Sequence, residues 1–184
     1  MSEDPDLFPA ALISAQVQSE LPDGYTLRPL RKSDYDAGFL DTLGVLTTVG
    51  DFSRAAFDER FDYMRKHEGT YYILVVEERK AGAGRAAVVG CGTVIVERKF
   101  IHQLGKVGHI EEIAVAKSQQ GKKLGLRIIH ALDHIAHAVG CYKTILDCSE
   151  ANEGFYVKCG YRRAGLEMAH YYPAPAAPAS GPPL

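Results

Sequence analysis

The segment Gln119-Gln120-Gly121-Lys122-Lys123-Leu124-Gly125 carries the clearest chemical signal in this 184-residue chain. It follows an alternating apolar run, residues 110–115, and opens a stretch with helical periodicity, in which the recurring residues are Leu124, Ile128, Leu132, Ile135 and Val139. A strand, a glycine-bearing turn and a helix start therefore come in that order. Such a turn points unpaired backbone N–H groups and the positive end of a helix dipole at one place, which suits a phosphate or pyrophosphate.

The donors of this anion site would be the backbone amides of Gly121 to Leu126, with positive charge added by Lys122 and Lys123. The chain order and spacing favour a pantetheine-pyrophosphate cofactor over a nucleoside triphosphate. Pantetheine amides pair like a β-strand, so the backbone of Ile113 to Val115, just before the turn, is the expected partner. The simpler alternative is a lysine-rich helix start that is merely solvated.

Carboxylates stand near the ends of two predicted strands. Glu111 and Glu112 are adjacent on one strand, so they are expected to face opposite sides of the sheet, and only one can enter a given pocket. Asp147 ends the next strand, where open α/β sheets place their ligands. A carboxylate, or a water chain that ends on one, could take the proton of an amine. Alternatively, these acids only solvate strand ends.

Two further groups could do chemistry. Tyr156 lies on a short predicted helix, and a phenol with a pKa of about 10 can donate a proton to a departing thiolate, although it could also be a core aromatic paired with Phe155. The other group is a stripe on one helical face, His130, His134 and His137. His-x-x-x-His can bind zinc. Asp133, the nearest acid, is one position off that face, so a solvated or dimer-facing stripe is preferred and no metal is expected.

Composition limits the classes of function. The net charge of −2 shows no general basic surface for nucleic acid. No apolar run approaches the roughly 20 residues of a membrane span. Met1 to Pro9 carries three acids and no basic residue, unlike a signal peptide. Scattered cysteines without C-x-x-C spacing predict reduced thiols and a cytoplasmic location; they are Cys91, Cys141, Cys148 and Cys159.

The elements that must position these residues follow from periodicity and turn residues. We expect a loose arm over 1–22, one domain over 23–172 and a disordered Pro/Ala-rich tail over 173–184. Strands are predicted at 25–31, 71–78, 87–99, 106–115, 142–148 and 161–172, with a hairpin connection at 79–85. Helices are predicted at 34–46, capped by Ser33 with Asp36 as an imperfect capping box, after Ser53, at 121–139 and at 150–159. The order β-α-α-β-β-β-α-β-α-β predicts an α/β fold, a mixed sheet with helices on both faces.

The turn in this setting resembles the GNAT superfamily of N-acetyltransferases. The family pattern is Gln or Arg, two residues, Gly, one residue, Gly or Ala; Gln120 and Gly125 match its ends, whereas Lys123 stands where the middle glycine is usual. Further blocks are similar to the glucosamine 6-phosphate N-acetyltransferases of fungi, namely residues 99–102, 108–115, 140–143, 146–148 and 152–161. The likeness runs from about Tyr25 to Met168. It implies a single-domain GNAT fold with a mostly antiparallel twisted sheet.

The resemblance also implies roles. Acetyl-CoA would be the cosubstrate, and glucosamine 6-phosphate would be acetylated by direct attack, without an acetyl-enzyme, on the path to UDP-N-acetylglucosamine. Tyr156 would lie beside the sulfur, and Glu111 and Asp147 would order and deprotonate the amine. Cofactor contacts are implied for Ile113, Val115, Gln120, Gly121, Lys122, Lys123, Leu124, Gly125, Leu126, Asn152 and Tyr156. Substrate contacts are implied for Thr47, Lys99, Phe100, Ile101, His102, Glu111, Glu112, Ile113, Tyr142, Lys143 and Asp147.

The family forms homodimers whose subunits share the substrate pocket, so residues 99–106 and the last strand are expected to be exchange surfaces. One departure concerns the chain's end, because relatives tend to finish the last strand with a basic residue. Here Met168-Ala169-His170-Tyr171-Tyr172 stands instead, and His170, Tyr171, Arg162 or Arg163 could replace that phosphate ligand. Two rivals stay open: a GNAT enzyme for a protein lysine or polyamine, and a non-catalytic acetyl-CoA-binding module.

Overall fold

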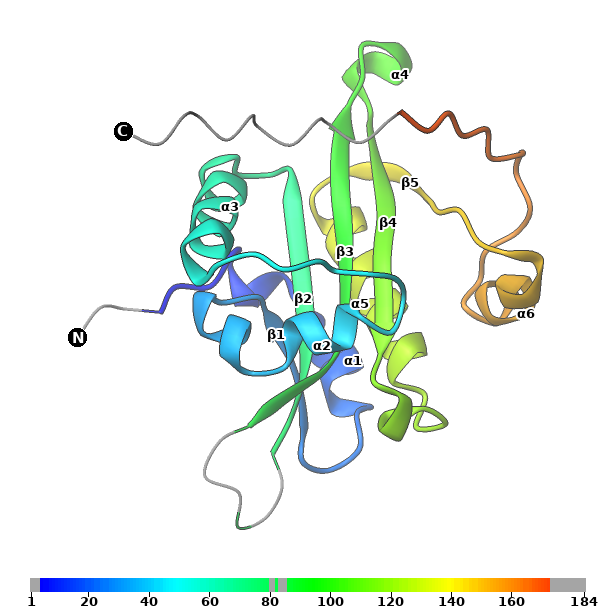
Figure 1. Cartoon of the computed structure of the whole chain (residues 1–184). Coiled ribbons are helices and arrows are strands. Elements are labelled where there is room, and N and C mark those ends of the chain that lie inside the picture. The colour runs from blue at the N-terminus through cyan, green and yellow to red at the C-terminus, as the bar shows by residue number, and fades with distance from the viewer. Residues whose placement is uncertain (1–3, 80–81, 83–85, 173–184) are drawn as a thin grey trace, which may run out of the picture. The chain divides into compact units, whose positions relative to one another are not determined.

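A mixed sheet organises the computed structural model, which describes residues 4–79, 82 and 86–172. In this described part, five strands lie in the order in which they occur along the chain, β1 (Tyr25–Pro29), β2 (Tyr71–Glu78), β3 (Ala87–Arg98), β4 (Lys106–Val115) and β5 (Cys141–Ile145). The first four are antiparallel neighbours, and β5 pairs parallel to β4 (Figure 1). The predicted mixed, mostly antiparallel sheet is confirmed.

The central strands form because their residues are apolar and β-branched enough to be buried on both faces. Leu74, Val75 and Val76 of β2 have no exposed surface, and Val94 of β3 has none either. Helices cover both faces, as predicted. In Figure 1, α2 (Phe39–Leu43) and α3 (Arg54–Lys66) lie in front of the sheet, whereas α5 (Leu124–Ala138) runs behind it.

The helix predicted over 34–46 is broken, which corrects the prediction. A 3-10 turn, Lys32–Asp36, comes first, and α2 starts only after Gly38, whose φ of 97° ends the helical path. The cap is also different, because the turn begins at Lys32 and the Asp34 carboxylate accepts a hydrogen bond from the Arg31 backbone N–H at 2.8 Å, so the capping pair is Arg31 and Asp34 rather than Ser33 and Asp36. The helix predicted after Ser53 is confirmed, and Ser53 caps it, since its Oγ accepts a hydrogen bond from the Ala56 N–H.

The described part of the predicted loose arm, residues 4–22, is instead folded. It contains a 3-10 turn, Ala10–Leu12, and the short helix α1, Ala15–Ser19. Leu7, Phe8 and Val17 are buried, and the Leu7 N–H donates to the Leu30 carbonyl. Apolar side chains at uneven spacing give no clear helical period, yet they still bury area against the sheet and α5.

The chain divides into two compact units, residues 1–146 and 147–184. The second contains α6 (Glu150–Lys158), to which the Arg163 guanidinium is tied by two hydrogen bonds to the Glu153 carboxylate. The predicted last strand is absent, because residues 161–172 adopt no regular structure. A strand needs a paired edge for its backbone, and no strand of the described residues pairs with this segment.

Three expectations lie outside the described residues, wholly or in part: the first residues of the arm, most of the connection at 79–85, and the Pro/Ala-rich tail at 173–184. None of the helices in the described ranges combines the length and apolar character needed to cross a bilayer.

Candidate active site

The turn between β4 and α5 has the geometry of an anion site. A 3-10 turn, Lys117–Gln119, leads to Gly121 with φ 83° and Lys123 with φ 60°, and α5 begins at Leu124 rather than at Gly121. Leu124 is buried, which fixes the helix start against the core. Among the described residues, the backbone N–H groups of 121–126 find no hydrogen-bond acceptor. These are the amides that the sequence predicted as donors, from Gly121 to Leu126. Unpaired N–H groups at the start of a helix attract anions.

The two lysines of this turn differ in their surroundings. The Lys122 Nζ donates hydrogen bonds to the Tyr25 hydroxyl and to the Gln119 side-chain oxygen, both at 2.6 Å. Within the described chain, Lys123 has no ion pair or side-chain hydrogen bond. The Gln120 side-chain amide lies 3.5 Å from the Val115 carbonyl oxygen, so it sits beside the end of β4.

A β-bulge in β4 brings two carboxylates to one face. Glu111 pairs across the sheet with Thr93, whereas Ala114 pairs with Cys91, so β4 has one extra residue here. Glu112 takes up the extra length with φ 54°. Its carboxylate lies 3.5 Å from the Thr93 hydroxyl, on the face that Glu111 also occupies. The prediction that Glu111 and Glu112 face opposite sides is therefore wrong, because the bulge interrupts the alternation.

The same bulge leaves Ile113 facing α5, as its Cδ1 lies with Ile128 and Leu132 beside Gly92. Beyond it, β4 has an open edge. The β5 strand pairs only with Lys106–His109, and no strand in the described chain pairs on that side with residues 110–115. This edge, which includes Ile113 and Val115, is thus open to an extended ligand, with the Gln120 side-chain amide at the Val115 carbonyl oxygen.

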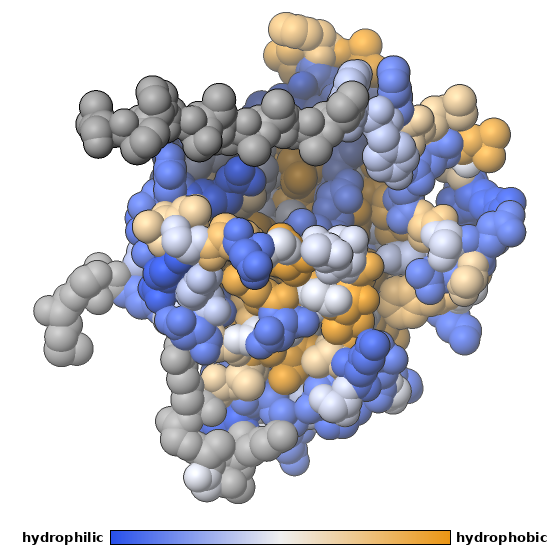
Figure 2. Space-filling view, in the orientation of Figure 1, coloured by the Kyte–Doolittle hydropathy of each residue, from blue (hydrophilic) through white to orange (hydrophobic). Residues whose placement is uncertain are grey.

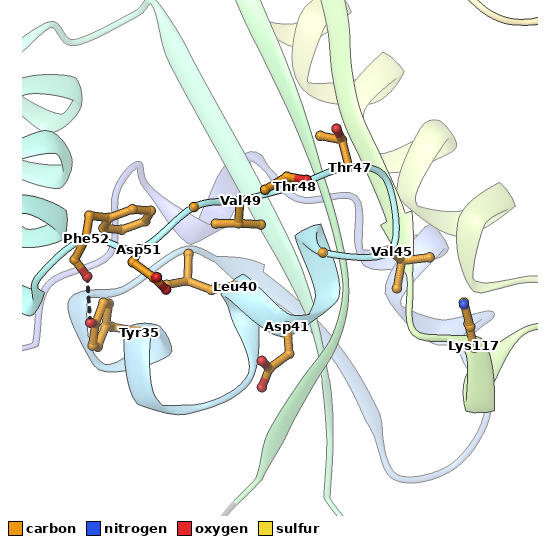
Figure 3. A pocket seen from close by; sticks show the side chains of 12 residues that line it. Tyr35, Leu40, Asp41, Val45, Thr47, Thr48, Val49, Asp51, Phe52 and Lys117 are labelled. Carbon is orange, nitrogen blue, oxygen red and sulfur yellow. Dashed lines mark hydrogen bonds between the residues drawn. The ribbon is translucent and has the colours of Figure 1, made fainter. Parts of the chain in front are cut away.

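Two adjoining cavities are lined by residues of the segment 44–52, and Figure 3 shows one of them. One of about 550 Å³ has mostly apolar walls and Glu112 among its lining residues; the other, of about 660 Å³, includes Asp41 and Lys117. Thr47 lines both. Figure 3 shows the Tyr35 hydroxyl donating to the Phe52 carbonyl at 3.0 Å, which closes one end of the loop. Figure 2 shows apolar surface framed by polar residues at this face.

Six of the predicted substrate residues lie elsewhere in this unit, where the β3–β4 hairpin tip meets the start of β5. They are Lys99, Phe100, Ile101, His102, Tyr142 and Lys143. The His102 ring lies 4.6 Å from that of Tyr142, and the Lys143 ammonium lies 5.8 Å from the same Tyr142 ring. Lys99 forms an ion pair with Glu97 at 2.7 Å. Hydrogen bonds from Lys99 and His109 hold the pKa of Glu97 below its usual value.

The remaining predicted residues belong to the second unit. Asp147 and Asn152 are exposed, and Asp147 lies past the end of β5, which stops at Ile145 rather than at Cys148. Tyr156 is half-buried on α6, with its ring 5.0 Å from that of Phe155 and 6.3 Å from that of Tyr161. No residue of α6 is fully buried, so Tyr156 is not a core aromatic of this unit.

Cysteine nucleophiles find little support in the first unit. Cys91 pairs with Ala114 beside the bulge, with its Sγ 3.8 Å from the Glu112 carbonyl oxygen, and burial raises the pKa of its thiol to about 12. It is therefore neutral at physiological pH. In the described chain, no three His, Cys, Asp or Glu side chains gather as a metal site, and the histidine stripe forms none.

Sequence reasoning missed the polar residues that hold the turn from the far side, Tyr25, Glu78 and Gln119. Tyr25 and Glu78 are far from the turn in sequence, and no local pattern could have linked them to it. Gln119 opens the turn segment itself, and that position was the one available signal.

Comparison with known proteins agrees with this geometry. The acetyltransferase (GNAT) family profile matches residues 31–161. A glucosamine 6-phosphate N-acetyltransferase of Candida albicans is 48% identical over 80% of this chain and 96% of its own length, and one of Dictyostelium discoideum is 43% identical over 86% and 98%. The crystal structure of the glucosamine-6-phosphate N-acetyltransferase of Arabidopsis thaliana superposes with a TM-score of 0.76 at 37% identity, covering 81% of this chain and 99% of that one. The chain therefore belongs to the GNAT family of acetyltransferases, among the glucosamine 6-phosphate N-acetyltransferases.

Proposed function

We propose that this protein transfers the acetyl group of acetyl-CoA to the amine of glucosamine 6-phosphate, giving N-acetylglucosamine 6-phosphate and CoA. The observation that carries the proposal is the end of β4. There, unpaired turn amides, an open strand edge and two carboxylates on one face come together within residues 111–126. These are the parts that a thioester cofactor and an amine acceptor require, and the relatives named for this reaction match over nearly their full length.

We place the cofactor along this strand end. The diphosphate of acetyl-CoA would accept hydrogen bonds from the amides of 121–126, with charge from Lys123. The pantetheine amides would pair with the backbone of Ile113 and Val115, as an added strand does. This pairing would place the thioester beside the bulge, where the Glu111 and Glu112 carboxylates share a face.

The reaction needs a neutral amine and a protonated leaving group. Glu111, directly or through water, would take a proton from the sugar ammonium. The amine nitrogen then attacks the thioester carbonyl carbon, and the carbon–sulfur bond breaks. The Tyr156 hydroxyl would protonate the departing thiolate, while Asp147 would order the amine. Because the attack is direct, no cysteine has to carry the acetyl group.

The acceptor's sugar would lie by Thr47 and Glu112, at the cavities under residues 44–52. Its phosphate needs cations, and the hairpin tip with the start of β5 offers Lys99, His102 and Lys143. We propose that a homodimer completes this pocket, with each subunit's tip reaching its partner. The exposed apolar tip supports this, since Phe100 is 95% and Leu104 is 70% exposed. Figure 2 shows this apolar surface at the end of the hairpin.

A thiol-release assay with a panel of amines tests the function. We expect rapid CoA release with glucosamine 6-phosphate, much slower release with glucosamine, and none above background with a lysine peptide or spermidine. Mass spectrometry should show acetyl on the sugar nitrogen. Turnover of the peptide or polyamine without the sugar phosphate would refute the proposed acceptor. Acetyl-CoA binding with no turnover on any of these amines would favour a regulatory binding module.

A further inference from the structure

Four polar residues connect the turn to the far end of the sheet. Tyr25 begins β1 and pairs in register with Glu78 at the end of β2. The Tyr25 hydroxyl lies 2.7 Å from the Glu78 carboxylate and 2.6 Å from the Gln119 side-chain oxygen. The Gln119 amide donates to the other Glu78 oxygen at 3.0 Å. Lys122 completes this group, which we call the Tyr25 cluster.

The Tyr25 cluster holds its side chains in defined positions by burial and hydrogen bonding. Gln119 is only 5% exposed, and both ends of its amide are satisfied within the cluster. A buried amide with no partner would be costly, so its partners fix its position. The Glu78 carboxylate and the Lys122 ammonium give the cluster charge-assisted hydrogen bonds, which are stronger than neutral ones.

Lys122 therefore has a different role from Lys123. Its ammonium donates to Tyr25 and Gln119 and lies 5.2 Å from the centre of the Tyr25 ring. That charge is directed at the sheet, not at the unpaired amides. Lys123, which has no such contact among the described residues, is the cation left for an anion at the helix start.

The turn needs this support because its backbone is unfavourable. Gly121 and Lys123 both have φ in the left-handed region, and a lysine there costs free energy that other contacts must offset. Fixing Gln119 on one side and Lys122 on the other holds the peptide units between them. Amides that are already in position bind an anion without paying for their ordering at that moment.

We propose that the Tyr25 cluster positions the turn amides for the diphosphate of acetyl-CoA, with Lys122 as a structural strut and Lys123 as the contacting cation. The proposal rests on the proposed function for its ligand. Tyr25, Glu78 and Gln119 would be positioning residues, acting through the turn without touching the cofactor.

Tyr25→Phe tests the proposal by removing one oxygen while keeping the ring. We expect the Kd of acetyl-CoA, measured by titration calorimetry, and its KM to rise about tenfold, the effect of losing a hydrogen bond to charged groups. The kcat at saturating acetyl-CoA and the KM for glucosamine 6-phosphate should not change. The matched control is Tyr63→Phe, an exposed tyrosine on α3, which should leave every value unchanged. An unaltered acetyl-CoA affinity in folded Tyr25→Phe would overturn the inference.

Double-mutant cycles distinguish the roles of Lys122 and Lys123. Tyr25→Phe and Lys122→Met should be non-additive in acetyl-CoA affinity because they break one cluster, whereas Tyr25→Phe and Lys123→Met should be close to additive.

A second comparison uses dephospho-CoA, which lacks the 3′-phosphate. Lys122→Met should weaken the binding of CoA and the binding of dephospho-CoA equally. A loss seen with CoA alone would mean that Lys122 contacts the 3′-phosphate, which contradicts the strut role. Should the wild-type protein bind no acetyl-CoA, the proposed function fails instead. Lys122 is exposed, so its variant is informative even if Tyr25→Phe folds poorly.

Discussion

At the scale of single residues, the bulge at Glu112 decides what the strand end can do. An unbroken β4 would send one of its two carboxylates to the α5 face, away from the cavities. The extra residue keeps both on the Thr93 face. Two carboxylates can then divide the work of deprotonating the amine and holding the sugar, so their variants should have different effects.

We expect Glu111→Gln to lower kcat by about 100-fold at neutral pH, the usual size of a general-base contribution, with little change in either KM. Glu112→Gln should mainly raise the KM for the sugar phosphate. Steady-state kinetics between pH 6 and 9 distinguish the two roles. Because a base must be unprotonated, the Glu111→Gln profile should lose dependence on its ionisation, whereas Glu112→Gln should keep the wild-type shape. Equal kcat losses in both variants would contradict the division of roles.

A second residue-scale prediction concerns stability. The Asp34 carboxylate is fully buried and accepts from the Arg28 guanidinium at 2.7 and 2.8 Å and from the Arg31 N–H. Burial disfavours the charged guanidinium, but the hydrogen bonds that it donates to the Asp34 and Glu77 carboxylates, together with their negative charges, outweigh burial and raise the pKa of Arg28. Asp34→Ala would leave this cation without its main partner, so we expect a loss of about 3–5 kcal/mol in the free energy of unfolding.

Urea denaturation measures this loss. The matched control is Asp62→Ala, which removes the partner of Lys32 at an exposed ion pair and should change stability by less than about 1 kcal/mol. Similar losses in the two variants would show that burial does not set the value of the Asp34 pair.

The candidate site was only partly predictable at this scale. The turn could be located because its glycine, lysines and flanking periodicities are local signals. The shared face of Glu111 and Glu112 could not, since a bulge depends on how β4 pairs with β3. The Tyr25 cluster was equally hidden, because it joins residues 94 positions apart.

At the scale of elements, the packing of α5 on the sheet depends on a missing side chain at Gly92. A Cβ there would lie 2.5 Å from the Ile128 side chain, 2.7 Å from that of Ile113 and 3.0 Å from that of Leu132. We expect Gly92→Ala to cost about 1–3 kcal/mol, as overpacking does in a dense core. It should also weaken acetyl-CoA binding, because α5 carries the turn and Ile113 lies at the strand edge.

Thermal unfolding and acetyl-CoA titration of Gly92→Ala check both effects. Gly154→Ala on α6 is the control, because a Cβ there meets nothing within 4 Å and alanine favours a helix. An unchanged unfolding midpoint for Gly92→Ala would show that α5 can shift without cost.

Most elements followed from local patterns, and the exceptions have physical causes. The prediction of one continuous helix over 34–46 was wrong at Gly38, because its left-handed backbone interrupts the helix despite the apolar spacing on either side. The prediction of a loose N-terminal arm was wrong because this segment is stabilised by burial against α5 and the sheet, which leaves no periodic pattern in its sequence. The prediction of a strand over 161–172 was wrong because this segment pairs with no strand edge among the described residues.

At the scale of the whole molecule, each of the two compact units has a segment with exposed apolar side chains. At the hairpin tip these are Phe100, Ile101 and Leu104, and in the second unit they are Leu166, Met168, Tyr171 and Tyr172. Exposed apolar clusters of this kind mark interaction surfaces. The tip is also held in an unusual shape, since His102, Gln103 and Leu104 have φ of 53°, 57° and 61°. A homodimer would cover these side chains and would give residues 161–172 a strand edge to pair with.

Sedimentation velocity tests this proposed dimer. We expect the wild type to sediment at twice the subunit mass, and the double variant Phe100→Ser, Ile101→Ser to sediment largely as a monomer, because it removes two anchors of the interface. The monomer should bind acetyl-CoA normally, since the turn and the β4 edge lie within one subunit. Its kcat/KM for glucosamine 6-phosphate should fall by at least tenfold, because the partner's cations would be missing. The control, Tyr63→Ser, removes an exposed aromatic from α3 and should stay dimeric and active. A double variant that is monomeric yet fully active would show that one subunit holds the whole phosphate site.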